Sequence, residues 1–297
     1  MDQEAKPERI HPALLAKVST GCNHVFTGWQ GPTDTFRKVT IMAARTDQTL
    51  RRVAAAALDQ IQALAPDASE VSSARVPPTT ARDHLGQVLY LLTDVLQTLE
   101  RPTNTRAGSL AEHLADRQHA EATIRELIRS VVGTDSPESL LPQVHRLIAD
   151  LKARLGAPDL PAAVESLFGV VKLVDYLRGA LIEAAASAMR FRQPIVPAAA
   201  VEATRALTMV LGARFPGAVL ELRVPPAAAV QLGAFGAGPS HTRGTPPNVI
   251  EMDPLVFIGL ATGLKQWPKE LAAHSVQASG TQVDVVERML PVIQLHR

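Results

Sequence analysis

Val219-Leu-Glu-Leu-Arg-Val-Pro-Pro-Ala-Ala-Ala-Val-Gln-Leu-Gly-Ala-Phe235, followed by Val249-Ile-Glu-Met-Asp-Pro254, is the part of the sequence that decides the fold. Apolar and polar residues alternate from Val219 to Val224, which is typical of a half-buried strand. Two prolines end this pattern, and Ala229 to Phe235 is a second predicted strand. A loop rich in Gly and Pro separates it from a third predicted strand, Val249 to Met252.

A buried helix follows these strands directly. Asp253 is suited to the N-cap and Pro254 to the first helical position. The predicted helix, Leu255 to Thr262, is apolar on nearly all sides, so we expect it to be buried, and Gly263 ends it. Strands followed by a buried helix predict a small α+β layer.

Longer motifs in the same region carry a family resemblance. They are Leu222-Arg-Val-Pro-Pro226, His241-Thr-Arg-Gly-Thr-Pro-Pro-Asn-Val-Ile-Glu251, Leu260-Ala-Thr-Gly263 and Ala278-Ser-Gly280, together with Trp267. With them, this part of the chain resembles the sterol-carrier-like domain of actinobacterial sterol carrier family proteins. The resemblance implies a curved sheet covered by helices, with an apolar cavity that binds a lipid or another apolar small molecule.

Composition limits the classes of function. The 297 residues suffice for two domains, and 46% of them are hydrophobic. A net charge of +1 argues against nucleic acid or an anionic membrane surface as the main partner. Cys22 is the only cysteine, which excludes an intramolecular disulfide and a cysteine-based zinc site. Without a secretion signal or a spanning apolar segment, we expect a cytoplasmic protein with no integral membrane association. The oligomeric state is left open.

The first two thirds of the chain follow a helical period. Apolar residues recur at helical spacing over residues 36–64, 81–100, 110–131, 136–155 and 158–191. We therefore predict an up-and-down helical bundle over residues 36–192, preceded by an extension over 1–35. Gln193-Pro-Ile-Val-Pro197 is a stiff connector, so 193–198 is the predicted linker and 199–297 the second domain. The predicted fold class is α+β.

The last bundle helix carries a second resemblance. Leu173-Val-Asp-Tyr-Leu177 and Leu181-Ile-Glu183 resemble the mycothiol-dependent maleylpyruvate isomerase family, whose DinB-like bundle precedes a sterol-carrier-like domain. That resemblance implies a zinc ion held by Glu-x-x-x-His on this helix and by a histidine from an earlier one. Here Glu183 is kept, but Ser187 and Gln87 stand at the histidine positions. Neither residue binds zinc competitively, so we expect a degenerate site without metal or mycothiol.

One alternative to the degenerate site remains open, a relocated metal. His84 neighbours Gln87 in sequence and could converge with Gln87 and Glu183, and other histidines occur in the next helices at His113, His119 and His145. The favoured interpretation is that these histidines are surface or boundary residues of a metal-free bundle. If Glu183 is only a remnant, Glu183→Gln is expected to change neither stability nor activity, whereas a large loss would show that Glu183 is paired or functional.

The second domain supplies the candidate ligand-binding residues. The apolar candidates are Phe235, Ile250, Phe257, Leu260 and Leu290, although for any single one of them a place in the domain core is favoured over a place in a cavity lining. Arg243, with His241 beside it, is suited to hold a carboxylate or the polar end of a cofactor. The alternative is that Arg243 pairs with Glu251 or Asp253 and fixes the loop.

Three functions follow from these observations. The favoured one is a binding protein for a lipid or another apolar small molecule, rather than an enzyme, with no catalytic residues. The second is a mycothiol-dependent, metal-assisted isomerase or transferase with a rearranged zinc site. The third is a structural or interaction module without a ligand.

Overall fold

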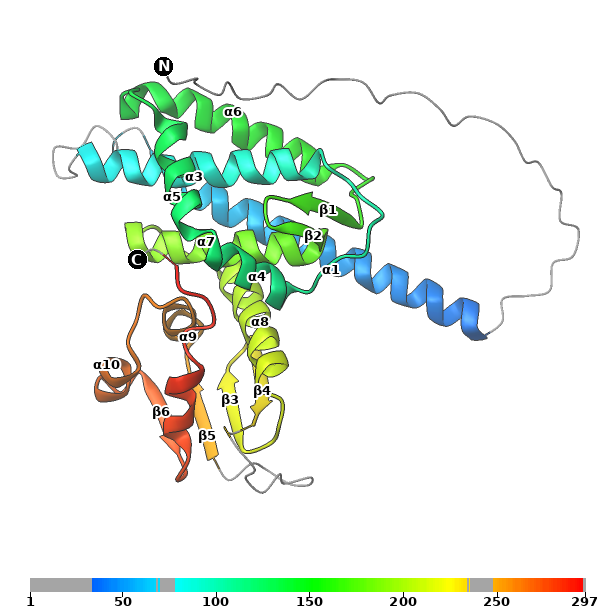
Figure 1. Ribbon diagram of the computed structural model, residues 1–297, viewed down its shortest axis with the longest axis vertical. Coiled ribbons are helices and arrows are strands. Elements are labelled where there is room, and N and C mark those ends of the chain that lie inside the picture. Colours follow the sequence, from blue (N-terminus) through cyan, green and yellow to red (C-terminus); the bar gives the residue numbers. More distant parts are fainter. Residues whose placement is uncertain (1–33, 68, 70–77, 234, 236–247, 296–297) are drawn as a thin grey trace, which may run out of the picture. The chain divides into compact units, whose positions relative to one another are not determined.

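The computed structural model describes residues 34–67, 69, 78–233, 235 and 248–295. The described residues from Ala44 onward form one compact unit. No helix within the described ranges combines the length and apolar character needed to cross a membrane. The predicted fold class is confirmed, because helices of a bundle are followed by a small α+β domain (Figure 1). His241 and Arg243 lie outside the described residues.

The bundle consists of long helices and one short hairpin. Its helices are α1 (Asp34–Leu64), α3 (Pro78–Leu99), α4 (Leu110–His119), α5 (Glu121–Val132), α6 (Pro137–Gly156) and α7 (Leu173–Phe191). α3 packs against α5, α6 and α7, and α4 packs against α7. Apolar side chains repeated along one face of α3, such as Leu85, Leu89 and Leu92, are fully buried there. The helical period therefore positions the core as expected.

The structure differs from the sequence predictions at two places in the bundle. The predicted helix over 110–131 is divided at Ala120 into α4 and α5, although no Gly or Pro stands in it. The last helix, predicted within 158–191, is α7, and the residues before it form a hairpin of β1 (Ala163–Ser166) and β2 (Gly169–Lys172) that was not predicted. Valines favour these strands, and Gly169 takes the positive φ of +100° that the turn requires.

The small domain has a mixed sheet covered by helices. Its elements are α8 (Pro197–Arg214), β3 (Leu220–Val224), β4 (Ala228–Leu232), β5 (Asn248–Met252), α9 (Pro254–Ala261), α10 (Trp267–Ala272), β6 (Val276–Ser279) and the 3-10 helix η1 (Val283–Met289). The strand order is β4-β3-β5-β6. β3 and β5 are parallel, with Leu222 opposite Ile250, and the other pairs are antiparallel. The last helical element, η1, is a 3-10 helix.

The bundle and the small domain share buried surface. Leu181 and Ile182 of α7 belong to the same hydrophobic cluster as Leu207 of α8 and Ile258 of α9. The connection between α7 and α8 is held by the buried amide of Gln60. Its Nε2 donates to Pro194 O at 3.1 Å, and its Oε1 accepts from Val196 N at 2.9 Å. The division of the chain at residues 193–198 stays a prediction.

Candidate functional site

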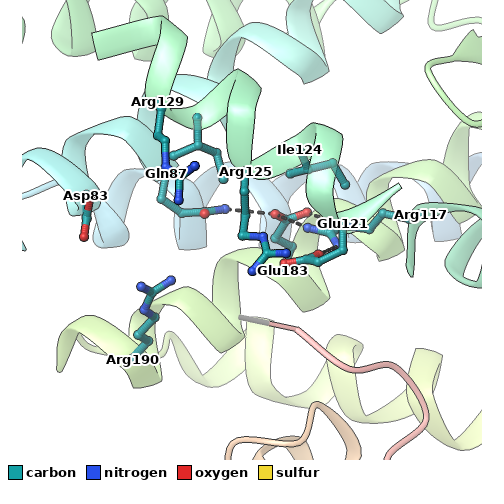
Figure 2. Close-up of a pocket in the computed structure, with 10 residues that line it drawn as sticks. Asp83, Gln87, Arg117, Glu121, Ile124, Arg125, Arg129, Glu183 and Arg190 are labelled. Carbon is teal, nitrogen blue, oxygen red and sulfur yellow. Dashed lines mark hydrogen bonds and ion pairs between the residues drawn. The ribbon is translucent and has the colours of Figure 1, made fainter. Parts of the chain in front are cut away.

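A buried charged cluster lies where α3, α4, α5 and α7 meet. Gln87 comes from α3, Arg117 from α4, Glu121 from α5 and Glu183 from α7, and their side chains point toward one another (Figure 2). We call these four residues the bundle cluster. Each sits on the inward or boundary face of its helix, so helix packing alone brings them together.

Glu183 is the centre of the bundle cluster. Its side chain accepts a hydrogen bond from Gln87 Nε2 at 2.9 Å and another from Arg117 Nε at 2.7 Å. Arg117 Nη2 also forms an ion pair with Glu183 Oε1. Glu183 is 4% exposed and Arg117 3%, so this pair is shielded from water. The two nitrogens of one guanidinium thus face the two oxygens of one carboxylate, the bidentate geometry that makes such pairs strong.

Glu121 adds a second carboxylate to Arg117. Its Oε2 lies 2.9 Å from Arg117 Nη1. Burial lowers the pKa of Arg117, but the charge of Glu183 and its hydrogen bond outweigh burial and raise this pKa above the usual value. The guanidinium is therefore a permanent cation within the bundle.

The residues present do not fit a zinc ion. The sequence-predicted positions Gln87 and Glu183 are brought together as expected, and Ser187 is fully buried one turn further along α7. However, both oxygens of Glu183 face nitrogen donors, and Gln and Ser offer only neutral oxygen. Within the described ranges, no group of three or more His, Cys, Asp or Glu side chains is arranged to hold a metal.

The histidines considered for a relocated metal lie in separate places. The Nε2 atom of His84 is 2.6 Å from the carbonyl oxygen of Leu64, and its ring stacks on Phe191 with centroids 4.5 Å apart. His113 is buried between Phe168 and Tyr176, with both centroid distances at 5.8 Å. His119 and His145 are exposed on α4 and α6.

The half-buried carboxyl of Asp94 and the buried ring of His113 lie near the bundle cluster and have shifted pKa values. Tyr176 Oη donates a hydrogen bond to Asp94 Oδ2 at 2.7 Å. Burial raises the pKa of the Asp94 carboxyl to about 6, although the Tyr176 hydrogen bond opposes this rise. Burial lowers the pKa of His113 to about 4, and the positive charge of Arg117 acts in the same direction.

Sequence reasoning did not identify Arg117. One signal was available, because Arg117 falls on the same helical stripe as Leu110 and Leu114, both of which are buried. An arginine on an apolar stripe indicates a buried partner, since an unpaired buried charge is costly. Its partner Glu183 is 66 positions away, and no local pattern joins the two.

A pocket of about 180 Å³ opens beside the bundle cluster. We call it the bundle pocket. Besides the four cluster residues, its walls include two isoleucines of α5 and the charged residues Asp83, Arg125, Arg129 and Arg190. Figure 2 shows Arg125 and Arg129 extending from α5 and Arg190 from α7, on different sides of this space.

The small domain contains a larger cavity of about 640 Å³, which we call the carrier cavity. Its lining combines apolar side chains with a polar edge and consists of Leu260, Gly263, Lys265, Gln266, Trp267, Pro268, Glu287, Leu290, Pro291 and Gln294. Lys265 is paired with Glu270 at 2.9 Å. Gly263 has a φ of +78°, and a Cβ at this residue would overlap the side chain of Gln294.

The structure separates the apolar ligand candidates into three groups. Leu260 and Leu290 line the carrier cavity. Ile250 and Phe257 are fully buried in the domain core. Phe235 is 44% exposed, and its ring contacts Phe215 at 5.3 Å between centroids and lies under Arg288. The assignment of all five as ligand residues stays a prediction.

The chain is similar to solved structures, and one part of it matches a family model. The chain is similar to a crystal structure of a histidine-to-alanine mutant of mycothiol-dependent maleylpyruvate isomerase, with 13% identity and a TM-score of 0.43 over 80% of this chain and 92% of that one. It is also similar to a crystal structure of mycothiol-dependent maleylpyruvate isomerase, with 16% identity and a TM-score of 0.36 over 69% of this chain and 94% of that one. No curated protein sequence matches the chain significantly. Residues 197–292, which contain the whole carrier cavity except Gln294, match the family described as bacterial SCP ortholog.

Proposed function

We propose that this protein binds a lipid or another apolar small molecule in the carrier cavity. The observation that carries the proposal is the size and lining of that cavity. Its volume of about 640 Å³ lies within the range of small-molecule sites, and Leu260, Trp267 and Leu290 offer apolar surface beside polar groups. The match of residues 197–292 to a family of bacterial SCP orthologs supports the same reading.

The proposal includes a bundle that works without a metal. Its support is the engagement of Glu183 by Arg117 and Gln87, which uses the oxygens that a zinc ion would need. A guanidinium supplies positive charge but has no open coordination position, so it cannot activate water or a thiol as a metal does. Binding is therefore favoured over metal-assisted catalysis.

Native mass spectrometry of the protein as purified, without added metal or chelator, tests both parts. A mass excess that matches a lipid supports the proposal and gives the ligand class. A mass excess of one zinc would refute the metal-free bundle and favour a thiol-dependent enzyme.

Fluorescence quenching tests where the ligand binds. The sequence contains two tryptophans, Trp29 and Trp267. In the Trp29→Phe variant, tryptophan fluorescence therefore comes from Trp267, which lines the carrier cavity. Dibromostearate is expected to quench this emission in a saturable way, and unbrominated stearate is the control for indirect effects. Absence of saturable quenching would count against a chain-binding cavity here.

A matched pair of substitutions locates the site further. Leu290→Asp puts a charge in the cavity lining and is expected to weaken dibromostearate binding by at least about tenfold. Leu255→Asp changes a 46% exposed residue in the first turn of α9, outside the lining, and is expected to bind like the parent. Equal binding by both variants, with unchanged circular dichroism spectra, would place the ligand elsewhere.

A further inference from the structure

One polar side chain of the carrier cavity is not engaged by the protein. Gln294 belongs to the lining and is half-buried. Its backbone nitrogen donates a hydrogen bond to Gln118 Oε1 at 3.2 Å. Its carboxamide, in contrast, has no hydrogen bond or ion pair among the residues that the structure describes. Two N–H donors and one carbonyl acceptor are therefore available to a molecule in this cavity.

The position of Gln294 is set by its neighbours in the chain. Val292 N and Ile293 N donate hydrogen bonds to the carbonyl oxygen of Ala261 at 2.8 and 3.0 Å. Leu295 N donates to the next carbonyl oxygen at the end of α9 at 3.1 Å. The three donors are buried apolar residues. The backbone on both sides of Gln294 is thus attached to α9, so a ligand does not have to order it.

Gly263 provides the space for the carboxamide of Gln294. A Cβ at Gly263 would overlap both the oxygen and the nitrogen of this carboxamide, so the amide group lies directly over the glycine. Gly263 also belongs to the lining of the carrier cavity. The polar end of the Gln294 side chain therefore lies at the wall of the cavity.

The charged side chains of the lining do not favour an ionic headgroup. Lys265 is the only cation in the described lining, and its Nζ lies 2.9 Å from Glu270 Oε1. Glu287, an exposed residue of the lining, adds another carboxylate. A carboxylate or phosphate headgroup would therefore meet a cation that is already paired, together with the negative charge of Glu287. An ammonium headgroup would meet the positive charge of Lys265.

We propose that the ligand of the carrier cavity is an apolar molecule with a hydroxyl group, and that Gln294 is the residue that selects it. A hydroxyl is uncharged and can either donate to Gln294 Oε1 or accept from its Nε2. A carboxylate only accepts, and an ammonium group only donates. A ligand that leaves the half-buried carboxamide unpaired loses affinity, which is how a hydrogen-bonding site rejects analogues. This inference rests on the proposed function, because it assumes that the ligand binds in the carrier cavity.

Four compounds with the same decyl chain test the inference: decanol, decanoate, decylamine and decyl methyl ether. Each competes with dibromostearate in the Trp29→Phe variant, and recovery of the Trp267 emission measures displacement. Decanol is expected to displace dibromostearate at about one tenth of the concentration of decanoate or decylamine, whose charges are costly to bury. It is expected to need about one fifth of the concentration of the ether, which has no O–H donor.

Substitutions of Gln294 test its role in selection. Gln294→Leu removes the amide and nearly keeps the size of the side chain, so decanol and the ether are expected to bind with equal affinity. Gln294→Lys adds a cation to the lining and is expected to reverse the preference, so that decanoate binds more tightly than decanol.

Gln277→Leu is the matched control, because it makes the same change at an exposed position of β6 outside the lining. It is expected to keep the preference of the parent for decanol. Circular dichroism checks the fold of each variant. The readout is a ratio of affinities within one variant, so a general loss of stability does not imitate the expected result.

The outcomes separate the inference from the proposed function. Absence of saturable quenching by dibromostearate would overturn both. If dibromostearate binds but decanoate, decylamine or the ether displaces it as well as decanol does, the hydroxyl preference is overturned and the carrier cavity stands. A Gln294→Leu variant that still prefers decanol over the ether would overturn the role of Gln294.

Discussion

Replacing Glu183 by Gln keeps the size of the side chain but removes the negative charge that faces Arg117. Both partners are almost fully buried, at 4% and 3% exposure, so water cannot take over the role of the lost charge. Removing one partner of a buried ion pair typically costs about 3–5 kcal/mol. Glu121 remains 2.9 Å from Arg117, so the guanidinium keeps one carboxylate. We therefore expect a loss near the lower limit, about 3 kcal/mol in the free energy of unfolding.

Urea unfolding at pH 7, followed by circular dichroism, measures this loss. Glu126→Gln removes the same charge from an exposed position of α5 and is expected to change stability by less than about 0.5 kcal/mol. The double variant Arg117→Met/Glu183→Leu removes both charges and is expected to recover most of the lost stability, since well-packed apolar residues often replace buried pairs without cost. A loss below about 1 kcal/mol for Glu183→Gln, typical of surface pairs, would refute the reasoning.

Further predictions concern pH and backbone conformation. Because the pKa of Asp94 is raised, the folded protein holds this proton more tightly than the unfolded chain does. The contribution of Asp94 to stability therefore falls as the pH rises from about 4 to about 6. In urea titrations, Asp94→Asn is expected to gain up to about 3 kcal/mol of unfolding free energy relative to wild type between pH 4 and pH 7. The lowered pKa of His113 has the opposite effect, because stability is lost as the pH falls from about 6.5 to about 4. His113→Gln is expected to reduce this loss of unfolding free energy at low pH by up to about 3 kcal/mol. If the unfolding free energy of the variant depends on pH as that of wild type does, the ring is not buried in its neutral form. Gly263→Ala is expected to lower the free energy of unfolding by about 1–3 kcal/mol, because alanine disfavours the φ of +78° and its Cβ would meet the side chain of Gln294. A melting temperature equal to that of wild type would contradict this geometry.

Single variants are needed to measure the contribution of either Asp94 or His113 to the pH dependence of stability. Asp94 and His113 titrate in overlapping ranges with opposite effects on stability. In the wild-type chain the two effects partly cancel, so a flat pH profile would say little about either group. Each substitution removes one contribution and exposes the other.

The sequence predicted the small domain well because its signals are local. Alternating strands, the Asp253 and Pro254 start and the Gly263 end each depend on a few neighbouring residues. The hairpin before α7 was missed because its strands of four residues stand next to a long helix with a strong period. The break at Ala120 had no local signal, since neither Gly nor Pro marks it.

In the candidate site, too, some residues were predicted from the sequence and others were not. Gln87 and Glu183 were grouped by resemblance, and the structure brings them together. Arg117 was missed because its role depends on a contact across 66 positions of the chain. The cavities were also beyond the reach of the sequence, since a lining residue such as Leu260 and a core residue such as Phe257 follow the same apolar pattern.

The guanidinium of Arg117 is covalently part of the chain, and this affects how the protein matures. A bundle centred on an ion has to acquire that ion from its surroundings, and it can lose the ion to a chelator or exchange it for a competing metal. Here the central positive charge is present as soon as the chain is synthesised. For the metal-free bundle that we propose, assembly would not depend on metal supply, and protonation of Glu121 or Glu183 would change the balance of charge around Arg117.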